Sequence, residues 1–159
     1  MTSARLGGLT VLVIGGSSGI GYEIARQASE RGARLIIAGR DPAKLAEAAE
    51  RLGGAVQTVA VDAHDGAAME SALSDLDVVD HVVSMVGDSM SGGFLTTKPE
   101  TMRHVLHSKF WSNWIIGRNA AGRIRDRSWT ELSSLAITSG SAATVSSSRW
   151  RASGCISMA

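Results

Sequence analysis

The sequence predicts a doubly wound α/β fold, in which a largely parallel sheet of about five strands carries helices on both faces. The alternation of two sequence patterns supports this fold class, and the length and composition support a single folded domain. Over the first 125 residues, short apolar runs that end near glycines alternate with stretches of helical period. The chain has 159 residues and is 44% hydrophobic, which suits one globular domain and excludes a chain that is disordered throughout.

The first third of the chain predicts two strands, each followed by a helix. Residues 9–14 are a short apolar run, the pattern of a strand that is buried on both faces. A helical pattern begins at Ile20, and residues 34–38 form the second apolar run. Asp41 then stands in the place of an N-cap, with Pro42 in the first turn of the next helix.

The same alternation continues to the middle of the chain. We expect a third strand at 55–61, a weaker helix at 65–76, a fourth strand at 78–86 and a long helix at 99–118. Residues 135–138 are a candidate fifth strand. We expect right-handed crossovers between these strands and the strand order 3-2-1-4-5 of a doubly wound sheet.

The composition of the chain changes near residue 126. The last part, 126–159, holds ten serines and two tryptophans but no lysine and no proline. We therefore divide the chain into an α/β core at 1–125 and a Ser-rich C-terminal segment at 126–159. We expect that segment to be irregular, or a short broken helix, beyond the fifth strand.

Charge and cysteine content exclude several classes of partner. The chain has 16 basic and 15 acidic residues, a formal net charge of +1, which gives no footprint for nucleic acid or an anionic membrane. The single cysteine, Cys155, forms no internal disulfide, as in a reducing compartment. The apolar run 9–14 is too short to span a membrane. We expect a soluble cytoplasmic protein with no nucleic-acid or membrane partner.

The strongest functional signal lies between the first strand and the first helix. Gly15, Gly19 and Gly21 have the spacing Gly-x-x-x-Gly-x-Gly, and glycines there let the backbone turn tightly and approach a pyrophosphate. Ser17 and Ser18 can add hydroxyl donors, and the N–H groups that start the helix favour negative charge. The alternative is a connecting turn that binds nothing, but the position between a strand and a helix favours a phosphate loop.

With Ile20 between the last two glycines, this loop resembles that of the short-chain dehydrogenase/reductase family. The family opens on Thr-Gly-x-x-x-Gly-Ile-Gly, and Ile14 stands here in place of the threonine. The resemblance covers about residues 7–125. It implies a Rossmann-type dinucleotide-binding core and an oxidoreductase that transfers hydride between a nicotinamide cofactor and a carbonyl or alcohol substrate.

The end of the second strand bears on which nicotinamide dinucleotide binds. An acid about 20 residues after the glycines would hold the ribose 2′-hydroxyl of NAD, but this position is Gly39, followed by Arg40. A guanidinium can pair with a 2′-phosphate, whereas Asp41 has a role as the helix cap. We therefore expect NADP rather than NAD. The alternative role of Arg40 is a solvated surface charge.

The resemblance implies two further cofactor contacts. Asp62, just after the third strand, is similar to the family acid at the adenine ring; the alternative is a capping residue of a turn or helix. After the fourth strand the family carries Asn-Asn-Ala-Gly, where this chain has Ser84-Met85-Val86-Gly87. Gly87 alone is kept, so the backbone shape is expected to survive while the asparagine contacts are lost.

The family's catalytic residues are matched only in part. Ser139 is similar to the serine that holds the substrate oxygen. Lys109 stands where the resemblance places a helix asparagine. It could donate a proton or bind a substrate anion; the alternative is a partly exposed helix residue with neither role. The family's Tyr-x-x-x-Lys pair is absent, because Trp150 and Gly154 occupy the two positions and the single tyrosine, Tyr22, lies on the first helix.

Three hypotheses remain open at the level of sequence. The chain is an NADP-dependent oxidoreductase, a nucleotide-binding module without turnover, or a truncated and inactive product of a longer dehydrogenase. The sequence names no substrate. It predicts no metal site, since His104 and His107 show no cysteine or carboxylate pairing with them. An unpaired sheet edge favours a homo-oligomer or an aggregation-prone patch, to which we expect the four tryptophans to contribute: Trp111, Trp114, Trp129 and Trp150.

Overall fold

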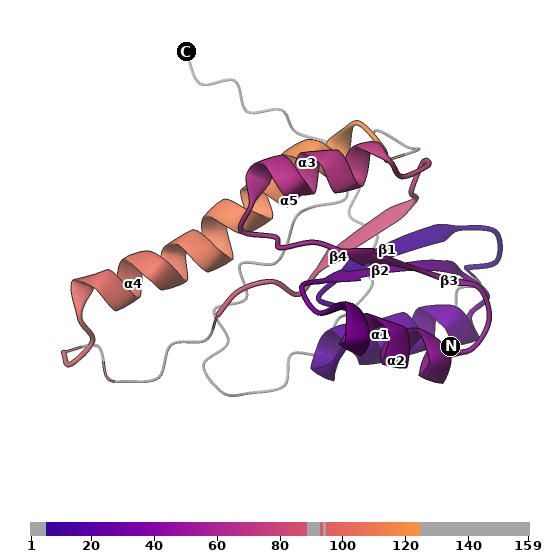
Figure 1. The fold of residues 1–159 in the computed structure, drawn as a ribbon, viewed down its shortest axis with the longest axis horizontal. Helices are drawn as coiled ribbons and strands as arrows, with labels where there is room; N and C mark the ends of the chain where they lie inside the picture. Colours follow the sequence, from indigo (N-terminus) through magenta and orange to yellow (C-terminus); the bar gives the residue numbers. More distant parts are fainter. Residues whose placement is uncertain (1–5, 89–92, 94, 125–159) are drawn as a thin grey trace, which may run out of the picture.

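The computed structural model describes residues 6–88, 93 and 95–124 (Figure 1). In this part of the chain four parallel strands form one sheet in the order β3-β2-β1-β4. The strands are β1 (Thr10–Ile14), β2 (Arg34–Gly39), β3 (Val56–Ala60) and β4 (His81–Ser84). This arrangement confirms the first four positions of the predicted strand order, 3-2-1-4. The expected fifth strand and the Ser-rich segment lie outside the described residues, so both stay predictions.

Helices cover both faces of the sheet (Figure 1), which confirms the doubly wound fold. One face carries α1 (Gly19–Glu30) and α2 (Pro42–Leu52). The other carries α3 (Gly66–Ser74) and α5 (Ser112–Ala121). Within these residues, no helix has the length and apolar character needed to cross a membrane.

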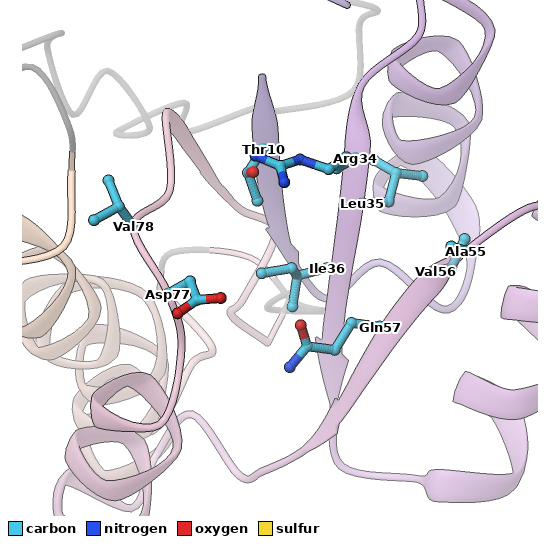
Figure 2. Close-up of a pocket in the computed structure, with 9 residues that line it drawn as sticks. All are labelled: Thr10, Arg34, Leu35, Ile36, Ala55, Val56, Gln57, Asp77 and Val78. Atoms are coloured by element: carbon cyan, nitrogen blue, oxygen red, sulfur yellow. The ribbon is translucent and has the colours of Figure 1, made fainter. Parts of the chain in front are cut away.

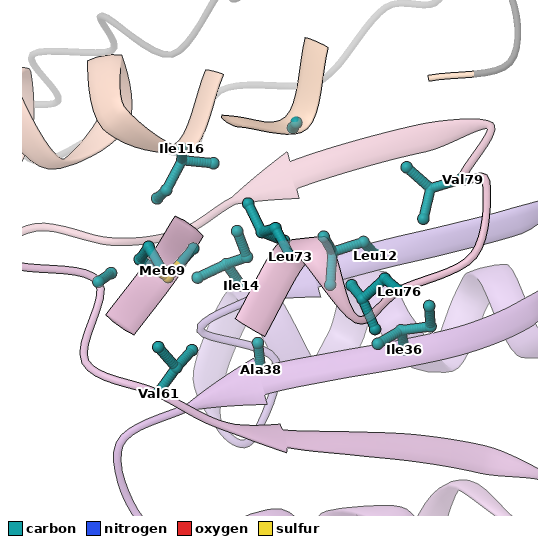
Figure 3. Close-up of a cluster of buried hydrophobic side chains, with 12 residues drawn as sticks. Leu12, Ile14, Ile36, Ala38, Val61, Met69, Leu73, Leu76, Val79 and Ile116 are labelled. Atoms are coloured by element: carbon teal, nitrogen blue, oxygen red, sulfur yellow. The ribbon is translucent and has the colours of Figure 1, made fainter. Parts of the chain in front are cut away.

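The sheet separates two hydrophobic cores because successive strand residues point to opposite faces. Val11 and Val13 of β1 pack toward α1 and α2. Leu12 and Ile14 pack toward the other face, where α3 contributes Met69 (Figure 3). Both sets are almost fully buried, so the continuous apolar run 9–14 has the role that its pattern predicts.

The predicted cap at Asp41 is present, and the structure adds a second cap. The carboxylate of Asp41 accepts hydrogen bonds from the backbone N–H groups of Ala43 (3.0 Å) and Lys44 (3.2 Å) at the start of α2. Asp65 caps α3 in the same way. The carboxylate of Asp41 is therefore occupied by the start of α2. Arg40, directly after β2, takes no part in this cap.

β4 is shorter than the predicted strand 78–86. The N–H of Thr10 donates to the side-chain carboxylate of Asp80 (2.8 Å), and the N–H of Asp80 donates to the carbonyl of Thr10 (2.9 Å). A side chain thus takes the place of a strand carbonyl, and the ladder with β1 begins one residue later, at His81. At the other end, Met85 donates to Ile14 (2.8 Å) before the chain leaves the sheet.

The predicted long helix 99–118 is one helical run with a change of winding in its middle. It consists of α4 (Pro99–Leu106), the π-helical turn η1 (His107–Trp111) and α5. The N–H of Ser112 bonds the carbonyl of His107, five residues earlier, which is the π-helical pattern. Lys109 lies in this turn, and α5, which follows it, is in contact with β4.

Candidate functional site

The carboxyl ends of the four strands meet at one edge of the sheet, where open α/β sheets bind their ligands. The glycine loop at 15–21 follows β1, and Arg40 follows β2. Asp62 comes two residues after β3, and Gly87 follows β4. The parallel sheet therefore brings the predicted cofactor residues of four separate segments to a single edge.

The glycine loop is packed too tightly for side chains on its inner face. A Cβ added to Gly21 would lie 2.1 Å from the carbonyl oxygen of Gly15, and one added to Gly16 would lie 2.9 Å from that of Val13. Gly15 has a φ of +83° and donates its N–H to the carbonyl of Ala38 on β2 (2.7 Å). The loop thus requires glycine at Gly16 too, a position missing from the predicted cofactor residues.

The start of α1 is accessible to an anion. Ser18 has the N-cap position, but its side chain makes no cap hydrogen bond, and the first turn holds no acidic residue. Ser18, Gly19 and Ile20 are exposed. The first N–H groups of a helix have no partner within the helix, so this end is able to donate to phosphate oxygens. The loop and the helix start fit the diphosphate of a dinucleotide.

Arg40 and Asp62 lie at neighbouring strand ends. The backbone N–H (3.0 Å) and the ring Nδ1 (2.9 Å) of His64 both meet Oδ1 of Asp62. These two hydrogen bonds are the main reason why the pKa of Asp62 lies below its usual value, and the positive charge of Arg40 lowers it further. Asp62 therefore caps a turn, its alternative role, and its contact with adenine stays a prediction. His64 was missed, although an aspartate after a strand is a signal for a turn in which its side chain accepts from the backbone two residues on.

The structure also brings Gly87 and Lys109 together. Gly87 has a φ of +135°, and a Cβ added to it would lie 2.6 Å from Cγ and 3.4 Å from Cα of Lys109. The lysine side chain thus lies against a backbone that has no side chain of its own. Lys109 is exposed. The candidate catalytic residue Ser139 lies outside the described residues, as do Trp150 and Gly154.

His104 has a carboxylate neighbour, so the expectation that no carboxylate pairs with the two histidines was wrong. Its Nε2 lies 2.8 Å from Oδ2 of Asp88, in the segment after β4. The two residues are 16 positions apart, and no sequence pattern links them. Within the described part of the chain, no group of three or more His, Cys, Asp or Glu side chains is placed to hold a metal.

The aromatic residues of η1 and α5 lie on the surface. Trp111 and Trp114 stack with ring centroids 5.0 Å apart, and both are partly exposed. Trp129 and Trp150 lie outside the described residues. The expected role of these tryptophans in self-association stays a prediction. Tyr22 packs on the opposite side of the sheet, with the guanidinium of Arg51 4.5 Å from its ring centroid.

A hollow of about 680 Å³ lies at the opposite end of the strands, beside their amino ends (Figure 2). Arg34 and Thr10, at the amino ends of β2 and β1, line it together with Asp77. It is remote from the glycine loop. The strand ends, rather than this hollow, therefore define the candidate site.

Comparison with known proteins agrees with the fold and the loop. The chain matches the family model described as short chain dehydrogenase over residues 9–146. Galactitol 2-dehydrogenase (L-tagatose-forming) of Cereibacter sphaeroides is 35% identical over 130 residues, which are 77% of this chain and 51% of that enzyme. The uncharacterized oxidoreductase DltE of Bacillus subtilis is 54% identical over 43 residues, which are 27% of this chain and 17% of that protein.

Solved structures give the same result. A short-chain type dehydrogenase/reductase from Mycobacterium ulcerans superposes with a TM-score of 0.70 at 27% identity, covering 76% of this chain and 48% of that one. A short chain dehydrogenase from Mycobacterium smegmatis gives 0.67 at 25% identity, covering 75% and 52%. The chain spans about half the length of these relatives. By its family match, its parallel sheet and its glycine loop, the chain belongs to the short-chain dehydrogenase/reductase family of oxidoreductases, which bind a nicotinamide dinucleotide.

Proposed function

We propose that this chain binds NADP at the carboxyl edge of its sheet and serves hydride transfer to or from a carbonyl or alcohol substrate. The observation that carries the proposal is the tight glycine loop at the uncapped start of α1. Arg40, exposed after β2, occupies the region in which an acid would favour NAD. A guanidinium there can pair with a 2′-phosphate instead.

In this proposal, each part of the dinucleotide lies at the carboxyl end of a different strand. The N–H groups at the start of α1 donate to the diphosphate oxygens beside β1. Arg40 pairs with the 2′-phosphate after β2, and Asp62 accepts from the adenine amine after β3. The remaining, nicotinamide half extends toward β4, where Gly87 and Lys109 lie. When bound, the nicotinamide ring accepts or supplies the hydride.

Lys109 has the position of a substrate-side residue in this arrangement. Its side chain lies against Gly87, and its ammonium is a donor with three N–H groups. We assign it to the binding of a substrate anion or to the donation of a proton. Ser139 is proposed to hold the substrate oxygen, as the family serine does.

The role of Arg40 can be tested by its replacement with alanine. Hydrogen bonds to charged groups contribute about 1.5–3 kcal/mol, so Arg40→Ala is expected to weaken NADPH binding about 10- to 100-fold. NADH has no 2′-phosphate, and its affinity is expected to stay unchanged. Titration by the fluorescence of the reduced nicotinamide measures both dissociation constants.

Arg34→Ala is the matched control. It removes the same side chain at the other end of β2, where Arg34 is exposed beside the hollow at the amino edge. It is expected to leave both dissociation constants unchanged. The selectivity assigned to Arg40 is wrong if Arg40→Ala weakens NADPH and NADH equally or weakens neither.

A further inference from the structure

A single amide side chain joins the end of β4 to the π-helical turn. The hydroxyl of Ser84 donates to Oδ1 of Asn113, at the start of α5. The amide nitrogen of Asn113 donates to the carbonyl of Lys109 and, over 3.4 Å, to that of Val86. Asn113 thus uses both its acceptor and its donors on groups that flank the candidate site.

A buried serine holds the same segment at its other end. The N–H of Asp88 donates to Oγ of Ser108 (3.1 Å), and that hydroxyl donates to the carbonyl of Val105 (3.1 Å). Ser108 is fully buried. We call the side chains of Ser84, Ser108 and Asn113 the polar clamp. Their hydrogen bonds attach the backbone segment from residue 84 to residue 88 to η1 and to the start of α5.

Gly87 and Lys109 are the residues that the polar clamp brings into contact. The segment between Val86 and Asp88 is held at both ends, and Gly87 in its middle packs on the side chain of Lys109. In the proposed arrangement the adenine half lies over β2 and β3, and the diphosphate lies at β1. The surface formed by Gly87 and Lys109 therefore borders the nicotinamide half only.

We propose that Asn113 is a positioning residue for the nicotinamide half of the site. By bonding the carbonyls of Val86 and Lys109 it sets the distance between the segment after β4 and η1, and so the place of the Lys109 side chain. This inference rests on the proposed function. It separates the two halves of the cofactor, because the groups proposed to hold the adenine half and the diphosphate follow β2, β3 and β1, away from Asn113.

Two substitutions test the role of Asn113. Asn113→Ala removes all three hydrogen bonds. Asn113→Asp keeps the size and the acceptor for Ser84 but loses the N–H donors to Val86 and Lys109. Asn119→Ala is the matched control, because Asn119 is a half-buried asparagine on the same helix without a side-chain hydrogen bond among those of the described residues.

Calorimetric titration with NADPH and with adenosine 2′,5′-bisphosphate measures the effect on each half. Both Asn113 variants are expected to bind NADPH about tenfold more weakly and the bisphosphate, which lacks nicotinamide, within about twofold of the wild-type value. Asn119→Ala is expected to match the wild type on both probes. A purely structural role of Asn113 would weaken the binding of the bisphosphate as well, so the affinity for this probe distinguishes the two roles.

The other outcomes overturn the inference. Equal weakening of both probes, or failure of both variants to fold, would assign Asn113 a purely structural role. Unchanged NADPH binding would show that the polar clamp does not position the site. If the wild-type chain binds neither probe, the proposed function itself fails, and the inference fails with it.

Discussion

Substitution of Gly21 by alanine is expected to weaken NADPH binding about 100-fold and to lower the free energy of unfolding by about 1–3 kcal/mol. The added Cβ would lie 2.1 Å from the carbonyl oxygen and 2.8 Å from the carbonyl carbon of Gly15. Both are backbone atoms, so no side-chain rotation relieves the contact. The start of α1 must move away from the loop, and its N–H groups lose their alignment with the diphosphate.

Gly122→Ala is the control for this substitution. Gly122 ends α5 with a φ of −73°, and an added Cβ there meets nothing within 4 Å. Urea denaturation and NADPH titration are expected to give wild-type values for it. If Gly21→Ala also gives wild-type values in both measurements, the close packing of the loop on α1 is wrong.

Replacement of Ile116 by alanine is expected to lower the free energy of unfolding by about 2–5 kcal/mol. Ile116 is 0% exposed and lies in the cluster between α5, α3 and the sheet (Figure 3). Its loss leaves a cavity among Leu12, Ile14 and Met69, because the strands and helices around it cannot close together completely. The midpoint and slope of a urea denaturation curve measure the change.

Leu95→Ala serves as the comparison, since Leu95 is 95% exposed. Its effect on the free energy of unfolding is expected to stay within about 0.5 kcal/mol. Equal stability losses for the two variants would contradict the packing of α5 against the sheet.

The sequence predicts the fold well where a local pattern marks both ends of an element. β1 and β2 are continuous apolar runs because helices cover both of their faces. The cap at Asp41 marks the start of α2 to the residue. The start of β4 could not be predicted, because the apolar pattern does not reveal that the N–H of Thr10 bonds the side chain of Asp80.

The π-helical turn is also invisible in the sequence. Its winding differs from that of an α-helix by one residue in one turn, and the pattern of apolar side chains from 99 to 121 does not record so small a change. The turn matters for the site because Lys109 lies within it. Sequence reasoning places Lys109 on a helix, and only the structure places it against Gly87.

In the candidate site, too, the sequence predicts some residues and only the structure reveals others. Arg40 and the glycine loop are found from the sequence because each follows a strand, and parallel strands end at one edge; Asp62 is found from the family resemblance. The polar clamp could not be found, since Ser84 and Asn113 are 29 positions apart and each is an ordinary polar residue in its own segment. Such pairs depend on how the helix after β4 packs, which no local pattern contains.

Titration of the wild-type chain with NADPH and NADH tests the central claim most directly. Fluorescence of the reduced nicotinamide reports binding without any need for a substrate. We predict saturable binding of NADPH that is at least about tenfold tighter than that of NADH, because the Arg40 guanidinium meets a 2′-phosphate only in NADPH. Absence of saturable NADPH binding, or tighter binding of NADH, would contradict it.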